Sequence, residues 1–169
     1  MNATLSRRPL RRFWGWGVAC EHLTQEESAR IGMMVQMLGG QITDRTEPQV
    51  SDFTLPAPRI APPAALAAMF SDTPLDRLNH ALGKSYADLA RMWLRQVPHV
   101  PDWVAYPDDE QAVIDILDWA SRHNVAVIPY GGGSSVCGGV EAAVGSSYAA
   151  AVSLDMERLN RVLEVDPTS

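Results

Sequence analysis

Residues 125–140 read VAVIPYGGGSSVCGGV, and they contain the most informative pattern in the chain. The apolar run 125–128 predicts a buried strand, which leads into three consecutive glycines and two hydroxyl residues. Glycines let the backbone approach a ligand closely, and successive N–H groups of such a loop can converge on an anion such as phosphate. The same residues also suit a wide turn between strands, in which glycine only supplies positive φ. The local sequence leaves both interpretations open.

Two common nucleotide-binding patterns do not fit this stretch. Gly131-Gly132-Gly133 lacks the G-x-G-x-x-G spacing of dinucleotide folds, and no Gly-Lys-Ser/Thr follows as in the phosphate-binding loop of NTPases. The stretch also has no Lys, Arg or His. Phosphate binding here would therefore depend on backbone dipoles. For Cys137 we expect a small packed side chain, with a thiol beside the ligand as the alternative.

The composition is that of a globular protein with no strong preference for polyanions. The chain has 169 residues, of which 46% are hydrophobic and 20% charged, so a folded core is expected rather than disorder. The net charge of −6 argues against nucleic acid as a partner. Arg7, Arg8, Arg11 and Arg12 cluster near the start, and a solvated tail is their expected role.

Cysteine usage and hydropathy bear on the compartment. Cys20 and Cys137 are far apart and form no CxxC pair, so neither a disulfide framework nor a metal site is expected. This usage fits a reducing compartment, and we expect the cytoplasm. No apolar run approaches the ~20 residues that span a bilayer, so we expect no transmembrane segment.

The pattern of elements changes near residues 97–101. Before that point we expect helices and irregular segments. A capping box at Thr24 and Glu27 opens a helix whose methionine-rich face we expect in the core. Ser85 caps another helix, with an apolar stripe running from Tyr86 to Leu94. Further short helices are expected at 64–70 and from a cap within 71–73.

After that point the pattern is that of an α/β protein. Residues 103–128 predict a βαβ unit with parallel strands, in which the helix begins at Asp108 or just before it. A buried strand is expected at 149–154, then a turn containing Asp155 and Arg158, which we expect to be salt-bridged. The alternating residues 161–166 predict a half-buried strand.

Five collinear stretches carry a resemblance to a known family. They read WGWG at 14–17, GKSYADL at 83–89, PHVPDWVAYP at 98–107, VIPYGGGSSV at 127–136 and SLDMERLNRVL at 153–163. Together they resemble the PCMH-type FAD-binding domain of the vanillyl-alcohol oxidase superfamily, and within it the alkyldihydroxyacetonephosphate synthase group. The implied fold is mixed α/β (α+β): an N-terminal helical and irregular region, residues 1–97, then the first, incomplete part of the FAD-binding domain, residues 98–169.

The resemblance implies that the glycine loop holds the pyrophosphate of FAD. The family's Pro-x-Gly-Gly-Gly-Thr-Ser segment wraps that group with backbone amides and hydroxyls. The corresponding residues here are Pro129, Tyr130, Gly131, Gly132, Gly133, Ser134 and Ser135. Ser134 stands where the family usually has Thr, and the hydroxyl is kept. Some members attach the flavin covalently to a loop His, for which this segment offers no counterpart.

The family's later cofactor-binding segments, cap domain and catalytic residues have no counterpart in these 169 residues. We therefore expect no catalytic residue in this chain and a complementary chain that carries the rest. The implied function is FAD binding within an enzyme of ether-lipid synthesis, which exchanges an acyl group for a long-chain alcohol. The alternatives are part of an FAD-linked D-2-hydroxyacid oxidoreductase, an inactive remnant, or a phosphate- or nucleotide-binding module unrelated to flavin.

Overall fold

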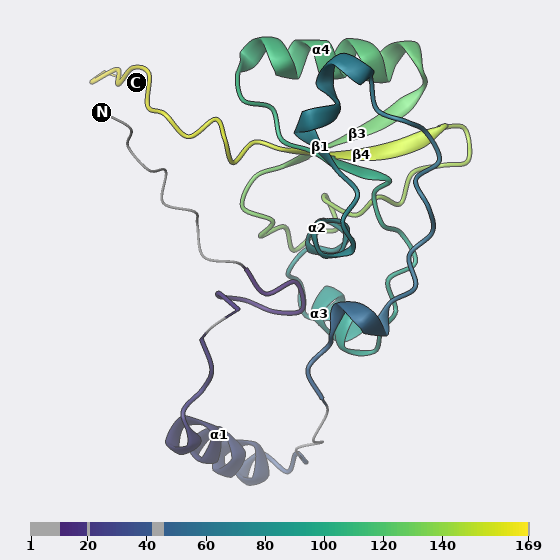
Figure 1. The fold of residues 1–169 in the computed structure, drawn as a ribbon. Helices are drawn as coiled ribbons and strands as arrows, with labels where there is room; N and C mark the ends of the chain where they lie inside the picture. The colour runs from purple at the N-terminus through teal and green to yellow at the C-terminus, as the bar shows by residue number, and fades with distance from the viewer. Residues whose placement is uncertain (1–10, 20, 42–45, 169) are drawn as a thin grey trace.

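A four-stranded sheet with helices on both sides forms the centre of the molecule (Figure 1). The computed structural model describes residues 11–19, 21–41 and 46–168. The strands lie in the order β1-β2-β4-β3, with β1 antiparallel to β2 and the other pairs parallel. The bounds are β1 (Phe70–Ser71), β2 (Trp103–Ala105), β3 (Val125–Tyr130), β4 (Ala150–Asp155), α1 (Gln25–Met37), α2 (Pro74–Asn79), α3 (Tyr86–Trp93) and α4 (Glu110–Arg122), with 3₁₀ turns η1 (Val50–Asp52) and η2 (Ala64–Met69). The mixed α/β fold class is confirmed.

The βαβ prediction for 103–128 is right about the elements and wrong about which strands pair. β2 and β3 both run parallel to β4, which lies between them. In the register, Val152 of β4 lies opposite Trp103 on one side and Val127 on the other. β4 has no exposed residue along its length. A strand of mainly apolar residues, such as AAVSL, is best buried at the centre of a parallel sheet, which explains why β4 takes this position.

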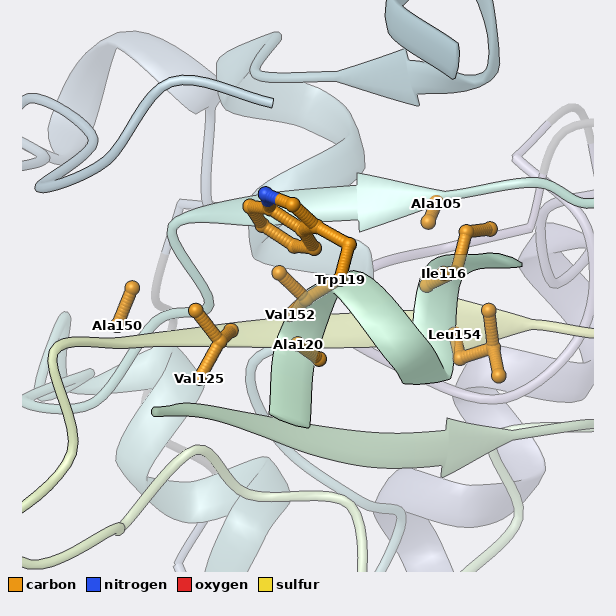
Figure 2. Packing of buried hydrophobic residues seen from close by; sticks show 8 residues of the cluster. All are labelled: Ala105, Ile116, Trp119, Ala120, Val125, Ala150, Val152 and Leu154. Atoms are coloured by element: carbon orange, nitrogen blue, oxygen red, sulfur yellow. The ribbon is translucent and has the colours of Figure 1, made fainter. Parts of the chain in front are cut away.

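Helix α4 covers one face of the sheet. Asp109 is its N-cap and accepts a hydrogen bond from the Ala112 N–H at 2.8 Å, so the helix begins at Glu110, at least two residues later than predicted. Figure 2 shows the side chains that join helix and sheet, with Ile116 and Trp119 of α4 set against Val152 and Leu154 of β4. Burial of these apolar side chains holds β2, β4 and β3 together, at roughly 25 cal/mol for each Å² removed from water.

The two short helices on the other side begin where the sequence predicts. The Thr73 side chain caps α2, with Pro74 in the first turn, and Ser85 forms a capping box with Asp88 at the start of α3. The predicted apolar stripe of α3 is wrong in detail. Tyr86 is 89% exposed, and the buried residues of this helix are Asp88 and Met92. The capping carboxylate of Asp88 is buried, whereas Tyr86 and Ala87 in the same turn are exposed.

Two predictions about the N-terminal region need correction. The Thr24–Glu27 capping box forms, but α1 has no buried residue, and its methionines, among them Met37 at 88% exposed, do not join the core. Figure 1 shows α1 lying apart from the sheet, so no described element covers its apolar face. Residues 64–69 form a 3₁₀ turn, and Phe70 begins a short strand rather than ending a helix. A cap fixes where a helix starts, whereas burial requires a partner surface.

The predicted half-buried strand at 161–166 is absent. Within the described residues this segment pairs with no strand, and Val162, Leu163 and Val165 are 81%, 93% and 77% exposed. Alternation favours a strand only if a neighbouring edge is free to pair. The strand just before it, β4, already has β2 and β3 on its two sides. In the described part of the chain the longest helices have 13 residues, and none is long and apolar enough to cross a membrane.

Candidate functional site

The glycine loop begins at the carboxyl end of β3. Pro129 and Tyr130, predicted as loop residues, are the last two residues of this strand. Tyr130 lies opposite Asp155 of β4, and its carbonyl accepts a hydrogen bond from the Met156 N–H at 3.0 Å. Pro129 is compatible with the sheet because β3 is an edge strand, where a missing N–H costs nothing. Gly131 is therefore the first residue that leaves the sheet.

The backbone of this loop is arranged as an open set of donors. Among the described residues, none accepts a hydrogen bond from the N–H groups of Gly131, Gly132, Gly133 or Ser134. Gly131, Gly132 and Ser134 are exposed, and Gly133 is buried with φ at +67°. A run of unpaired N–H groups around a left-handed residue is the usual geometry of an anion-binding concavity.

Ser135 holds the loop in place. Its carbonyl accepts a hydrogen bond from the Lys84 N–H at 2.7 Å, and its Oγ accepts one from the Gly139 N–H at 3.1 Å. Its hydroxyl is thus occupied within the protein, whereas Ser134 is exposed on the loop surface. Ser134 and Ser135 were predicted to share one role. In the structure, Ser135 holds the loop in place, whereas Ser134 is accessible from solvent.

Tyr130 supports the loop from below. Its side chain is buried, and its hydroxyl donates to the Asn79 carbonyl at 3.0 Å. Gly133 lies directly over this ring, since a Cβ built on Gly133 would be 2.1 Å from Tyr130 Oη. Burial, followed by the nearby Asp155, raises the pKa of Tyr130 to about 12. The Tyr130 ring is therefore uncharged and held in place, and the left-handed turn at Gly133 packs against it.

A buried His–Asp pair in turn positions Tyr130. His80 Nε2 lies 2.8 Å from Asp155 Oδ2, and both side chains are almost completely buried. His80 Nδ1 donates to the Asp76 carbonyl at 2.7 Å, because a carbonyl can only accept. The imidazole packs against the Tyr130 ring with 4.0 Å between ring centroids. α2 is thereby tied to the ends of β3 and β4, from which the loop departs.

The sequence did not single out this pair. His80 has no distinctive local pattern, because its role depends on a contact 75 residues away in the chain. The salt bridge expected within the 155–160 turn is also different. Arg158 pairs with Asp108 at 2.8 Å, and Asp155 faces inward to His80. The alternation of side chains along β4 could have indicated the orientation of Asp155. It places Asp155 on the same face as Ala151 and Ser153, away from α4.

Two basic side chains from elsewhere in the chain reach the loop. The Arg11 guanidinium donates to the Gly132 carbonyl. The Lys84 ammonium donates to the Arg12 and Phe13 carbonyls at 3.0 and 3.3 Å. Burial, followed by the charge of Arg11, lowers the pKa of Lys84 to about 8, while Asp88 opposes this effect. Arg11 is exposed, as the solvated-tail prediction requires, but it also contacts the glycine loop, which that prediction did not include. Arg7 and Arg8 lie outside the described residues.

Other residues considered from the sequence have local roles. His123 is the C-cap of α4, and the exposed His99 pairs with Glu141. Cys137 is exposed rather than packed, and hydrogen bonds with Ser135 and Gly139 lower its pKa. Cys20 lies outside the described residues.

Comparison with known proteins places the loop within a recognised domain. Residues 101–169, which contain β2, α4, β3, the glycine loop and β4, match the FAD binding domain family. The alkyldihydroxyacetonephosphate synthase of Trypanosoma brucei brucei is 39% identical over 93 residues, which are 55% of this chain and 15% of that protein. The synthase of Dictyostelium discoideum is 38% identical over 101 residues, which are 60% of this chain and 16% of that protein.

A solved structure described as alkyldihydroxyacetonephosphate synthase in P1 superposes with a TM-score of 0.76 at 28% identity, covering 93% of this chain and 34% of that one. A second, in P212121, gives 0.73 at 27% identity, with 92% and 34% covered. The chain thus spans about a sixth of the length of the curated relatives it matches and about a third of these solved chains. Residues 101–169 thus match the FAD binding domain family, and the chain resembles part of the alkyldihydroxyacetonephosphate synthases.

Proposed function

We propose that the chain binds the diphosphate of FAD through residues 129–135. The observation that carries this proposal is the row of four successive N–H groups, from Gly131 to Ser134, that has no acceptor among the described residues. The match of residues 101–169 to the FAD binding domain family supports FAD as the ligand. In this arrangement the glycine amides donate to phosphate oxygens, and the exposed Ser134 adds a hydroxyl donor.

The remaining members of the motif shape the loop. Pro129 and Tyr130 end the strand, Tyr130 fixes Gly133 from below, and Ser135 anchors the far side of the loop to Lys84. When bound, FAD would supply an electron-accepting ring system, and the residues described here would hold its diphosphate and orient it at the edge of the sheet. None of these residues is proposed to be catalytic.

We further propose that the chain contributes this site to an enzyme of the alkyldihydroxyacetonephosphate synthase type. The two curated relatives and the two solved structures described above carry this name, which favours it over the D-2-hydroxyacid oxidoreductase alternative. The relatives are several times longer than the chain, and a complementary chain that supplies the rest of the FAD domain and the cap stays a proposal. The division into residues 1–97 and 98–169 and the cytoplasmic location stay predictions.

A charge substitution at Gly132 tests the proposed site. A Cβ at this exposed position would meet only Ser134 Oγ, at 3.6 Å, so a side chain is accommodated. Gly132→Asp places a carboxylate beside the diphosphate, and Gly132→Asn has the same shape without the charge. FAD fluorescence titration should give an affinity at least about tenfold weaker for Asp than for Asn, because like charges held close together repel. Equal affinities for the two variants would reject the loop as the diphosphate site.

A companion titration separates FAD from other ligands. Riboflavin contains the flavin ring without the diphosphate, and ADP contains the diphosphate without the flavin. If ADP binds as tightly as FAD, the unrelated nucleotide-binding module is the better description. Tighter binding of FAD than of either part supports the flavin assignment.

A further inference from the structure

Two other sequence stretches meet at the glycine loop. The WGWG stretch at 14–17 and the GKS stretch that starts at Gly83 both lie against the site, to which only Lys84 has been assigned above. A Cβ built on Gly83 would be 2.2 Å from the Ser135 carbonyl oxygen, so only glycine permits this approach. Lys84 then joins the loop to the N-terminal segment through its two carbonyl contacts. Figure 1 shows that segment passing beside α3.

The N-terminal segment 11–18 is fixed to the body of the protein. Phe13 is buried, and Trp14 packs edge-on against Trp93 with 5.4 Å between ring centroids. The Trp93 indole N–H also donates to the Trp14 carbonyl at 3.1 Å. A backbone bridge pairs Arg11 with Val18, which closes the segment into a hairpin-like turn. These contacts hold Arg11 over the glycine loop.

Arg11 and Lys84 are two cations that no carboxylate of the described residues neutralises. The Lys84 ammonium has three N–H groups, and the Arg12 and Phe13 carbonyls use two of them. Arg11 and Lys84 are close enough for the charge of one to disfavour the charge of the other. Two like charges held together without a carboxylate partner are electrostatically unfavourable, so the arrangement is suited to binding an anion.

A cavity lies between these groups. Its volume is about 300 Å³, and it opens between the N-terminal segment and the glycine loop. Its lining includes Arg11, Trp16, Lys84, Gly132 and Ser134. The cavity therefore has a cationic side from Arg11 and Lys84 and a side formed by two residues of the proposed diphosphate loop.

We propose that Arg11 and Lys84 form the cationic wall of the diphosphate site, and that residues 11–18 are a component of the cofactor site. The proposal rests on the proposed function, because it takes the diphosphate of FAD as the ligand. The loop amides and Ser134 bind the diphosphate from one side. Arg11 and Lys84 neutralise its charge from the other side, so that two elements far apart in sequence enclose the group.

Charge-removing variants test this wall. Arg11→Gln and Lys84→Met are compared with Arg30→Gln, which removes the same charge from exposed α1. In FAD titrations at rising NaCl, Arg11→Gln and Lys84→Met should each bind about tenfold more weakly at low salt, the loss expected for a charge-assisted hydrogen bond. Their affinities should also depend less on salt than that of the wild type, whereas Arg30→Gln should match the wild type.

Three further measurements separate a role in binding from a role in folding. Arg11→Lys should recover part of the lost affinity, since it keeps the charge. Riboflavin, which has no diphosphate, should bind wild type and Arg11→Gln equally. The unfolding free energy of Arg11→Gln in urea should stay close to that of the wild type.

The outcomes distinguish this proposal from the one on which it rests. If Gly132→Asp weakens FAD binding and neither Arg11→Gln nor Lys84→Met changes affinity or salt dependence, the wall is rejected and the loop stands. If Arg30→Gln has the same effect as Arg11→Gln, only the net charge matters and the wall is likewise rejected. If the wild type binds no FAD, both proposals fail together.

Discussion

Gly133→Ala should be the most damaging single-methyl change in the glycine loop. Gly133 has φ at +67°, a conformation that costs an L-residue roughly 1–2 kcal/mol. The new Cβ would also lie 2.1 Å from Tyr130 Oη and 2.5 Å from Cζ, closer than any normal contact. Overpacking of this kind typically costs ~1–3 kcal/mol.

The Tyr130 ring has little freedom to move away. It is held by the hydrogen bond to the Asn79 carbonyl and by the packed His80 ring. The conformational and steric costs therefore add, and the expected loss of unfolding free energy is about 3 kcal/mol. Urea denaturation followed by tryptophan fluorescence measures this loss, since the chain has 5 tryptophans.

Gly131→Ala is the matched control. A Cβ at Gly131 meets nothing within 4 Å, and φ there is not left-handed. Its unfolding free energy should be unchanged or slightly raised, by less than ~1 kcal/mol. In a Tyr130→Leu background, Gly133→Ala should lose its steric cost and retain mainly the conformational one, a coupling of about 1–2 kcal/mol. Equal effects at Gly131 and Gly133, or no coupling to Tyr130, would refute the proposed support of the loop.

Three other predictions follow from charged groups. Burial lowers the pKa of Lys84 to about 8, so Lys84 should take up a proton when diphosphate binds near pH 8. Calorimetry in buffers of different ionisation enthalpy should detect this proton uptake, and Lys84→Met should abolish it. Asp155→Ala leaves the buried His80 imidazole without its carboxylate and should lower the unfolding free energy by ~3 kcal/mol or more. Asp108→Ala breaks the exposed ion pair with Arg158 and should lower the unfolding free energy much less. Similar losses in the two variants would contradict the role of the His80–Asp155 pair in positioning Tyr130. Arg91 lowers the pKa of Glu141 from 4.5 to about 2, so the stability from this pair is present above pH 4.5 and is lost as the pH falls to 2, a dependence that Glu141→Gln should reduce in acid denaturation.

The features that could be predicted from the sequence are those set by neighbouring residues. Ser85 marks a helix start because its hydroxyl satisfies an N–H three residues later. The strand that leads into Gly131 was also predictable, because an apolar run followed by glycines has few other structural outcomes. The family resemblance then identified the domain to which that loop belongs.

The features that could not be predicted depend on pairing across long sequence separations. The insertion of β4 between β2 and β3 follows from which apolar faces fit together, and local pattern does not report this. Arg11 and Lys84 reach the glycine loop through contacts about 121 and 51 residues apart in the chain. An N-terminal arginine cluster is usually solvated, so only the docking of Trp14 reveals that Arg11 is held over the loop.

For the apolar face of α1 and for the segment 161–166, the sequence pattern predicted burial that the structure does not show. Both have patterns that would bury apolar side chains if a partner were present, and in the described structure none covers them. Periodicity states which face can be buried, whereas burial itself is a property of the assembled surface.

Backbone amide chemical shifts test the central claim most directly. In an ¹⁵N–¹H correlation spectrum of the labelled chain, addition of FAD should shift the amides of Gly131, Gly132, Gly133 and Ser134, because these N–H groups are proposed to donate to the diphosphate. ADP should shift the same four amides, and riboflavin should leave them unchanged. Binding of FAD that leaves these amides in place, with the shifts elsewhere in the chain, would contradict the account.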